Sequence, residues 1–294
     1  MASVEMAYDV YDPHDEEGNL TPIVLLHGMF WNKYMFKELA RKLCQETKRQ
    51  VYCPDLRNHG RSPFCEECDN YLVCEDVKRF LQEKNLKKVI FICHSFSCTI
   101  CYMIALEKPD AVEKMVMVDS FPFNDFHADL CGDFVPEVVA QNKVLKSLNP
   151  KMTLKDARKK LNLLAEAGPK RVKFTAQICN LEQLFYKKVA HDLTKEDGKF
   201  MWKTDIDFLE EKILRQRNFT FFRNKIECHS EHEILIVRCP QSTNVTDLKF
   251  AEILKDNPNT KLATIEGTTH LLLLEKEDEF VDIVCDFLGC NRED

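Results

Sequence analysis

Short apolar runs alternate with amphipathic segments from residue 22 onward, and this alternation limits the possible folds more than any other feature of the chain. The apolar runs lie at residues 22–26, 50–54, 88–93 and 114–118. Continuous runs of this length are typical of strands buried on both faces of a parallel sheet. The segments at residues 33–47 and 72–83 space their apolar residues as amphipathic helices do, and residues 97–108 are predicted to form a further helix that ends before Pro109. The order predicts an α/β fold with a mostly parallel central sheet wrapped by helices.

The strand signal stops at residue 120 and returns only near residue 229. Between these points the periodicity is helical, at residues 138–148, 154–167 and 172–188. Strand and helix patterns then resume at residues 234–238, 247–255, 261–265 and 276–288. We therefore expect residues 1–120 and 229–294 to form one core, with residues 121–228 inserted as a helical cap. At the N-terminus, residues 4–10 alternate apolar and polar side chains, which predicts an edge hairpin that turns at residues 17–19.

Charge and hydropathy exclude several classes of partner. The 294 residues carry a formal net charge of -7, which repels nucleic acid. The longest apolar runs are far shorter than the roughly 20 residues of a membrane-spanning helix, so no transmembrane segment is expected. The first residues have the features of neither a signal peptide nor an organelle transit peptide, which predicts a cytoplasmic location. We expect a monomer or a weak homo-oligomer.

The cysteines do not form a recognisable framework. Without a secretory signal, the 14 cysteines, including Cys93 and Cys101, are predicted to be reduced and mostly buried. Cys65 and Cys68 have the spacing of half a zinc site, but no second pair follows at a suitable distance. We expect ordinary thiols there, and no metal or other cofactor.

The strongest chemical motif lies where the strand at residues 88–93 meets the following helix. There His94-Ser95-Phe96 resembles the nucleophile elbow G-x-S-x-G, a sharp turn that lifts a serine hydroxyl above the sheet. Cys93 and Ser97 replace the two glycines, so a plain strand-to-helix turn remains the alternative for this motif alone. Its context favours Ser95 as a nucleophile.

A serine nucleophile needs an imidazole to take its proton and a carboxylate to orient that imidazole. His270 follows the last expected strand, where this fold class places its base. For the acid we favour Asp119, at the end of the strand before the expected cap, over Asp247. The oxyanion would be held by the backbone amides of Met29 and Phe96. Residues 59–62 would shape the same rim without taking part in the chemistry.

Several motifs together resemble the family of the alpha/beta hydrolase domain-containing protein 11 and its bacterial esterase relatives. The resemblance runs from about residue 22 to 288 and rests on residues 27–30, 54–63, 94–95, 118–120 and 267–270. It implies an α/β-hydrolase fold, a helical cap with a hairpin or turn at residues 197–203, and hydrolysis of carboxylic or thio-esters. It also implies lipid substrates such as diacylglycerol for animal members, and mitochondrial location for some of them.

The resemblance supports Ser95, Asp119 and His270 as the triad, with Asp207 in the cap as a second reserve acid beside Asp247. The elbow departs from the family, because Cys93, Ser97 and Cys98 stand where it has glycines. We expect a serine hydrolase of carboxylic or thio-esters that acts through an acyl-enzyme on Ser95, with a lipid or other small-molecule acyl ester as substrate. The alternative is a weak or inactive member that binds a small apolar ligand. The acyl pocket is expected to include Phe30, Phe121, Phe123 and Phe185, together with Phe174 and Leu184. For the five residues from 121 onward, packing in the core is the alternative interpretation.

Overall fold

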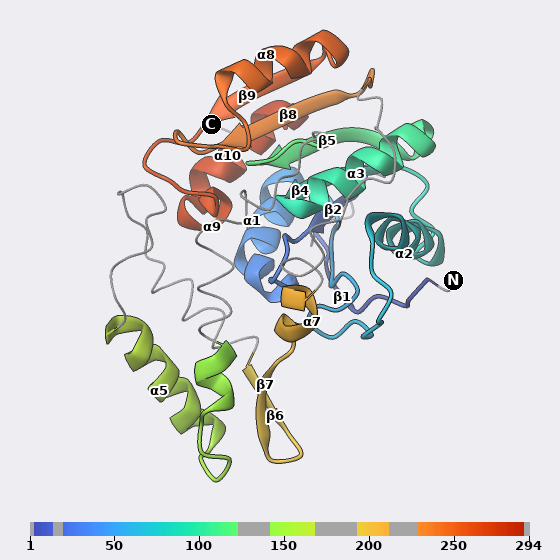
Figure 1. Cartoon of the computed structure of the whole chain (residues 1–294). Coiled ribbons are helices and arrows are strands. Elements are labelled where there is room, and N and C mark those ends of the chain that lie inside the picture. The colour runs from blue at the N-terminus through green and yellow to red at the C-terminus, as the bar shows by residue number, and fades with distance from the viewer. Residues whose placement is uncertain (1–2, 14–19, 123–141, 168–192, 212–228, 291–294) are drawn as a thin grey trace.

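The computed structural model describes residues 3–13, 20–122, 142–167, 193–211 and 229–290. Its centre is a seven-stranded sheet with the order β1-β3-β2-β4-β5-β8-β9 (Figure 1). The strands are β1 (Tyr8–Tyr11), β2 (Ile23–Leu26), β3 (Val51–Pro54), β4 (Val89–His94), β5 (Val112–Val118), β8 (Glu233–Arg238) and β9 (Thr260–Thr264). Every neighbouring pair is parallel except β1 with β3. The mostly parallel sheet expected from the sequence is confirmed.

Helices pack against both faces of this sheet, as predicted. They are α1 (Lys37–Thr47), preceded by a 3-10 turn at Lys33–Phe36, α2 (Asn70–Glu83), α3 (Phe96–Glu107), α8 (Asp247–Asp256), α9 (Leu272–Glu275) and α10 (Glu277–Leu288). One apolar cluster joins the sheet to α2, α3 and α8, and another joins it to α1, α9 and α10. Strand β4 serves both clusters, because Phe91 and Cys93 belong to the first while Ile90 and Ile92 belong to the second.

Polar residues at the helix ends explain several of the boundaries. The Asp69 side chain accepts a hydrogen bond from Leu72 N at 2.9 Å and begins α2. Thr246 does the same for α8 through Lys249 N at 3.3 Å. Both caps satisfy amide groups that have no partner within the helix.

The predicted N-terminal hairpin is wrong in its pairing. Strand β1 pairs antiparallel with β3, with Tyr8 opposite Pro54, and does not pair with β2. The reason is that β2 already has β3 on one side and β4 on the other, so the edge left for β1 at this end of the sheet belongs to β3. The turn predicted at residues 17–19 lies outside the described residues.

The described part of the expected cap contains a helix and a hairpin. Helix α5 (Leu154–Ala167) has the predicted bounds, whereas the helix predicted at residues 172–188 lies outside the described part of the chain. Strands β6 (Leu193–Glu196) and β7 (Lys199–Trp202) pair antiparallel around Asp197 and Gly198. Both turn residues have positive φ, 49° and 77°, which suits a two-residue hairpin. Helical periodicity alone missed these strands, although the resemblance implied a hairpin or turn there.

A small apolar cluster connects this region to the α/β core. It contains Leu145, Leu161, Phe200 and Trp202 from the inserted segment and Phe30 from the loop after β2. Short helix α7 (Ile206–Glu210) follows the hairpin, and Asp205 N donates to Asn58 O at 3.2 Å just before it. These contacts fix the described part of the segment against the loops at the carboxyl ends of β2 and β3. That the segment is a separate cap domain stays a prediction.

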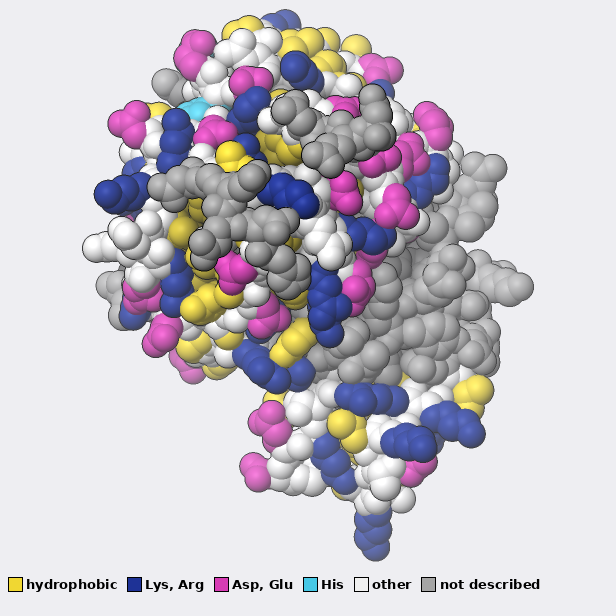
Figure 2. Space-filling view, turned by 180° about the vertical axis from the view of Figure 1, so that it is seen from behind, with side chains coloured by type: hydrophobic (Ala, Val, Ile, Leu, Met, Phe, Trp, Pro, Cys, Tyr) yellow, Lys and Arg dark blue, Asp and Glu magenta, His cyan; other side chains and the backbone are white. Residues whose placement is uncertain are grey.

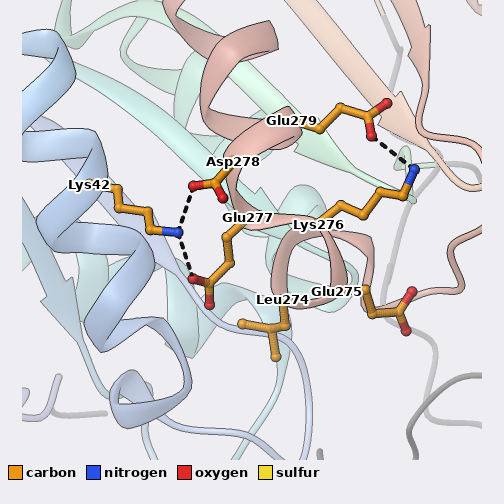
Figure 3. A pocket seen from close by; sticks show the side chains of 7 residues that line it. All are labelled: Lys42, Leu274, Glu275, Lys276, Glu277, Asp278 and Glu279. Carbon is orange, nitrogen blue, oxygen red and sulfur yellow. Dashed lines mark hydrogen bonds and ion pairs between the residues drawn. The ribbon is translucent and has the colours of Figure 1, made fainter.

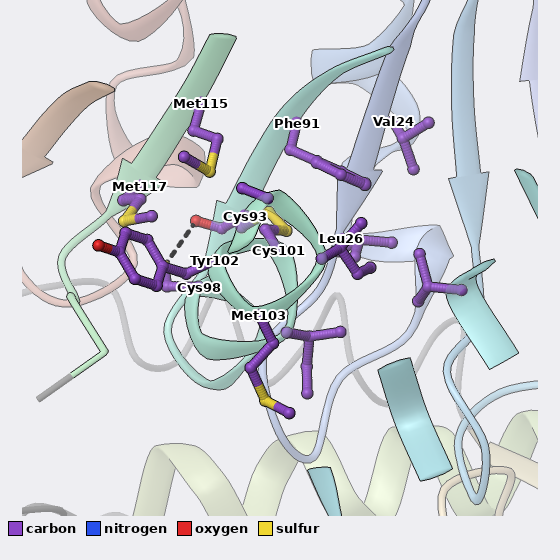
Figure 4. Packing of buried hydrophobic residues seen from close by; sticks show 14 of the residues in the cluster. Val24, Leu26, Phe91, Cys93, Cys98, Cys101, Tyr102, Met103, Met115 and Met117 are labelled. Carbon is purple, nitrogen blue, oxygen red and sulfur yellow. Dashed lines mark hydrogen bonds between the residues drawn. A yellow bond between two sulfur atoms is a disulfide. The ribbon is translucent and has the colours of Figure 1, made fainter. Parts of the chain in front are cut away.

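One expectation about the cysteines is corrected. Cys93 on β4 and Cys101 on α3 form a disulfide, although both were predicted to be reduced (Figure 4). The packing explains the pairing, because α3 lies directly on β4 and the two side chains belong to the same apolar cluster. The other described cysteines form no disulfide, and Cys98 Sγ lies 3.1 Å from Cys93 O.

Two buried ion pairs hold the loop after β3. Asp55 accepts from Lys33 Nζ at 2.5 Å and from Lys33 N at 2.7 Å. Arg57 donates from Nε and Nη2 to Asp76 at 2.6 and 2.7 Å. Asp76 also accepts from Val4 N at 2.7 Å, so it ties the loop, α2 and the N-terminal segment together.

The charged surface is mixed in sign. Figure 2 shows acidic and basic side chains interspersed over one face of the molecule, so the net charge of -7 does not form a single patch there. Within the described ranges, no helix combines the length and the apolar character that a membrane span requires.

Substitution Asp76→Ala is expected to destabilise the protein by about 3–5 kcal/mol, because it leaves the Arg57 guanidinium buried without its counter-charge. The matched control is Glu83→Ala, which removes the partner of partly exposed Arg79 and should cost below about 1 kcal/mol. Urea unfolding of both variants measures the difference. Equal losses would contradict this account of the buried pair.

Candidate active site

Ser95 lies at a strained turn between β4 and α3. Its backbone has φ 55° and ψ -118°, a conformation that L-residues with a side chain rarely adopt. Ser95 N donates to Val118 O at 3.1 Å, which holds the turn against the end of β5. The backbone therefore has the sharp strand-to-helix form expected of a nucleophile elbow.

The two residues that replace the elbow glycines are accommodated in the core. Ser97 is fully buried, and its Oγ lies 2.9 Å from Leu26 O and 3.0 Å from His94 O, so its proton has an acceptor in either direction. Cys93 points the other way, into the apolar cluster, where it is bonded to Cys101. Neither side chain leaves a polar atom unsatisfied at the turn.

His270 lies against Asp119. Its Nδ1 is 2.8 Å from Asp119 Oδ2. An ionised carboxylate can only accept a hydrogen bond, so Nδ1 carries the proton and Nε2 is left with its lone pair. This is the tautomer that a general base requires. The His270 side chain is 29% exposed, so a ligand can reach the imidazole.

Asp119 is fixed from the side of β8. Its φ is 48°, another strained value, and its backbone N donates to Val237 O at 2.8 Å. Its Oδ1 accepts from Cys239 N at 3.2 Å, and Asn244 Nδ2 donates to its backbone carbonyl at 3.1 Å. The carboxylate is thus held in one orientation by two hydrogen bonds, one of them from His270.

The two reserve acids lie elsewhere. Asp207, on α7, accepts from Lys146 Nζ at 2.6 Å and from Asn142 Nδ2 at 2.9 Å. Asp247 begins α8, is 87% exposed, and pairs with Arg238 at 2.5 Å. Of the three candidate carboxylates, only Asp119 contacts His270 in the described structure.

Ser95 and His270 are not hydrogen-bonded to each other. Within the described residues, no hydrogen bond joins Ser95 Oγ to the His270 imidazole. The ring that packs against His270 is that of His94, with centroids 4.8 Å apart. Catalytic hydrogen bonds are often long in ligand-free enzymes and tighten when substrate binds, so this arrangement is compatible with a serine–histidine pair.

Two buried histidines hold the loop that would carry the oxyanion donor. His27 Nδ1 donates to Gly28 O at 2.8 Å, and its Nε2 accepts from Leu56 N at 3.0 Å. His59 Nε2 accepts from Phe30 N at 3.3 Å, so the His59 ring lies against the backbone of this loop. In the described structure, no hydrogen bond uses Met29 N–H.

Gly28 is required by the close approach of this loop to the elbow. A Cβ on residue 28 would lie 2.7 Å from His94 Nδ1 and 3.2 Å from Ser95 Cβ. The loop after β2 and the elbow after β4 therefore touch, with Met29 next to Gly28 and Phe96 next to Ser95. The two backbone amides expected to bind an oxyanion come from segments in direct contact.

The predicted pocket residues are only partly described. Phe30 is buried in the cluster that joins the inserted segment to the core. Phe121 is buried against Tyr102, with ring centroids 5.4 Å apart. Phe123, Phe174, Leu184 and Phe185 lie outside the described residues. The composition of an acyl pocket stays a prediction.

The comparison with known protein families decides the identity of the fold. The sequence profile described as "alpha/beta hydrolase fold" matches residues 21–277. The chain belongs to the alpha/beta hydrolase family. Among solved structures, a marine microorganism esterase superposes with a TM-score of 0.77 at 24% identity, covering 97% of this chain and 100% of its own. This second likeness establishes the fold alone.

Curated relatives of this alpha/beta hydrolase are similar over nearly its whole length. Ethanol acetyltransferase 1 of Wickerhamomyces anomalus is 27% identical and covers 98% of this chain and 75% of its own. The sn-1-specific diacylglycerol lipase ABHD11 of Mus musculus is 26% identical and covers 95% of this chain and 84% of its own. The resemblance drawn from the sequence motifs is confirmed.

Sequence reasoning missed two residues that shape the loop of this hydrolase around His270. Glu275 accepts from Thr269 N at 2.7 Å and from Thr269 Oγ1 at 2.5 Å, which clamps the residue before His270. His94 Nε2 lies 2.8 Å from His270 O. In the sequence, His94 drew attention only because it precedes Ser95. A single glutamate in a predicted helix, such as Glu275, is typical of a solvent-exposed position and does not indicate a role.

A charged hollow lies behind this loop, between α1 and the start of α10. Lys42 Nζ lies 3.4 Å from Glu277 and 2.7 Å from Asp278. Figure 3 shows both carboxylates turned toward Lys42, with Leu274 close to Glu277 and Glu275 pointing away from this group. Its lining is almost entirely charged and its ion pairs are exposed to water. Such a lining does not suit an acyl chain, and we assign this hollow no part in the site.

Substitution Gly28→Ala is expected to destabilise the protein by about 1–3 kcal/mol, because the new Cβ overlaps the buried His94 ring. In the His94→Ala background the ring is absent, and the same substitution should cost at least about 1 kcal/mol less. Urea unfolding of the two single variants and the double variant measures this coupling. Additive losses would mean that the two residues do not oppose each other.

The buried histidines are expected to make folding sensitive to acid. Burial, followed by the nearby His270, lowers the pKa of His94 to about 3, and burial lowers the pKa of His27 well below its usual value. The unfolded chain therefore binds more protons than the folded chain once the pH falls below about 6.5. Stability should be complete above that pH and decline steadily toward pH 3.

Unfolding free energies measured in urea at several pH values between 4 and 7.5 test this dependence. His94→Gln, which cannot titrate, should show a shallower decline than the unsubstituted protein. Parallel curves for the two proteins would contradict the assignment of the effect to His94.

Proposed function

We propose that this alpha/beta hydrolase cleaves carboxylic or thio-esters through an acyl-enzyme on Ser95. The observation that carries the proposal is the 2.8 Å contact between His270 Nδ1 and Asp119, at the same end of the sheet as the strained Ser95 turn. A histidine oriented by a buried carboxylate, at the same end of the sheet as a partly exposed serine, is the minimum machinery for such a reaction.

The reaction follows from the position of each group. Ser95 Oγ attacks the acyl carbon while His270 Nε2 takes the hydroxyl proton, and the carbonyl oxygen becomes an oxyanion that accepts from the Met29 and Phe96 amides. His270 then protonates the leaving alcohol or thiol, which departs and leaves the acyl group on Ser95. Water attacks next, His270 takes its proton, and return of that proton to Ser95 releases the acid.

Asp119 stabilises the charged imidazole during both steps. Its carboxylate is buried and already bonded to Cys239 N, so it needs little rearrangement when charge develops on His270. Proton transfer still requires a movement of the Ser95 hydroxyl or the His270 ring, because the two are not hydrogen-bonded in this structure.

The names of the relatives point to an ester as the substrate class. The curated relatives are named for a diacylglycerol lipase and for an ethanol acetyltransferase, and both reactions make or break an ester of a carboxylic acid. We propose an apolar acyl ester as substrate, with the predicted phenylalanines of the inserted segment contributing to its pocket. If an alcohol attacks the acyl-enzyme in place of water, the acyl group is transferred to that alcohol and a new ester forms.

The mechanism predicts that a fluorophosphonate probe labels the protein and that Ser95→Ala abolishes the labelling. A series of p-nitrophenyl esters from acetate to palmitate, assayed with and without ethanol, defines the acyl length and the preferred acceptor. Hydrolysis that persists in Ser95→Ala would refute the acyl-enzyme.

Asp119→Asn is expected to lower kcat by about 10³–10⁴-fold, because an amide donor in place of the carboxylate favours the wrong His270 tautomer. Asp247→Asn and Asp207→Asn are the matched controls, since both carboxylates form surface ion pairs away from His270, and they should leave kcat within about twofold. A loss in either control equal to that in Asp119→Asn would move the acid to that residue.

A second candidate is a ligand-binding protein with a silent triad, and the absence of a Ser95–His270 hydrogen bond among the described residues favours it. In that case folded protein would bind an apolar ester without turnover and would not react with the fluorophosphonate. Labelling of Ser95 excludes this candidate.

A further inference from the structure

His94 is a buried polar residue that the proposed chemistry does not use. It is the last residue of β4, directly before Ser95, and is 1% exposed. It packs against the His270 ring on one side and approaches Gly28 on the other. It therefore lies between the elbow, the loop of the base and the loop of the expected oxyanion donor.

The hydrogen bond of His94 fixes its tautomer. Nε2 lies 2.8 Å from the backbone carbonyl of His270, and a carbonyl oxygen can only accept, so Nε2 carries the proton. Nδ1 is therefore an unprotonated acceptor. It is fully buried and has no hydrogen-bond partner within the described residues. Nδ1 lies close to Gly28, because a Cβ added to Gly28 would be 2.7 Å from this nitrogen.

Burying an imidazole nitrogen without a hydrogen-bond partner lowers the stability of the folded protein. An apolar side chain of similar size would avoid that cost, so the retained ring needs a reason in the hydrogen bond that it does make. That bond joins His94, the residue before the candidate nucleophile, to the backbone carbonyl of His270, the candidate base. Among the described hydrogen bonds, it is the one that links residues 94–97 to the loop at residues 265–275.

We infer that His94 is a positioning residue, whose Nε2–H sets the distance between the backbone of His270 and the elbow that carries Ser95. The inference rests on the proposed function, for which that distance decides whether proton transfer is possible. Asp119 orients the imidazole and Glu275 clamps Thr269, but both leave the separation between base and nucleophile open. The hydrogen bond from His94 Nε2 to His270 O fixes this separation.

His94 is not itself the base. Burial keeps its pKa near 3, so it is a weak proton acceptor at neutral pH. Its free nitrogen also faces Gly28, whereas the imidazole bonded to a carboxylate is that of His270. His94 acts through the backbone of another residue and not on the substrate.

The test compares two variants of similar side-chain length. His94→Gln keeps an N–H donor that can reach His270 O, and His94→Met removes the donor while filling the space. We expect Gln to retain kcat within about threefold, and Met to lower kcat by about 10–100-fold with KM nearly unchanged, because a displacement of about 1 Å at a reacting pair has effects of this size. Rescue by Gln separates positioning from mere space filling.

A second measurement does not depend on activity. The His270 Nδ1 proton, hydrogen-bonded to Asp119, should give a downfield proton NMR signal in the unsubstituted protein and in His94→Gln. In His94→Met this signal should broaden or vanish, because the freed loop lets Nδ1 leave Asp119. Circular dichroism confirms that each variant is folded.

The outcomes separate this inference from the proposed function. Unchanged kcat and an unchanged downfield signal in folded His94→Met overturn the positioning role and leave the ester hydrolase intact, and equal losses in Gln and Met also overturn it. If the unsubstituted protein has no activity that depends on Ser95, the proposed function fails, and the NMR comparison still decides whether His94 holds the loop.

Discussion

The parallel pairing of β4 with β5 is the constraint on which the site depends. Its register places His94 opposite Val118, so both strands end at the same level, and the next residues are Ser95 and Asp119. Ser95 N then bonds to Val118 O, while Asp119 N bonds to Val237 O on β8. The candidate nucleophile and acid are thus fixed by backbone hydrogen bonds of adjacent strands, before any side chain of the site is considered.

This arrangement concentrates strain at the carboxyl ends of the strands. Phe30, Ser95 and Asp119 all have positive φ, with values of 65°, 55° and 48°. Such conformations persist only where the surrounding structure holds them. Here the strand hydrogen bonds hold two of them, and the His59 contact with Phe30 N holds the third. At Ser95 and Asp119 the positive φ turns the chain away from the strand direction directly after β4 and β5, which places both side chains at this edge of the sheet.

Buried imidazoles act as rigid spacers between the loops at this edge. His27 and His59 have ring centroids 5.0 Å apart, and each accepts a backbone amide through Nε2. His94 instead donates through Nε2 to the carbonyl of His270. An imidazole can bridge two backbone segments with little loss of side-chain entropy, because only two torsions are fixed. Burial of these rings brings sensitivity to acid, since it lowers the pKa of His27 and His94 and so disfavours their protonated forms in the folded protein.

The local sequence by itself determined the α/β class, because the period of hydrophobicity records how each segment is buried. It also determined the placement of Ser95 at a strand-to-helix junction and of His270 after the last strand, since both depend on elements that are local in the chain. Tertiary structure alone decided which of Asp119, Asp207 and Asp247 contacts His270, because strand order brings the end of β5 beside both β4 and β8. It also decided the pairing of β1 with β3, the Cys93–Cys101 bond and the contact of His94 with His270 O. Each of these joins segments whose proximity is set by packing, and no pattern within either segment encodes the other.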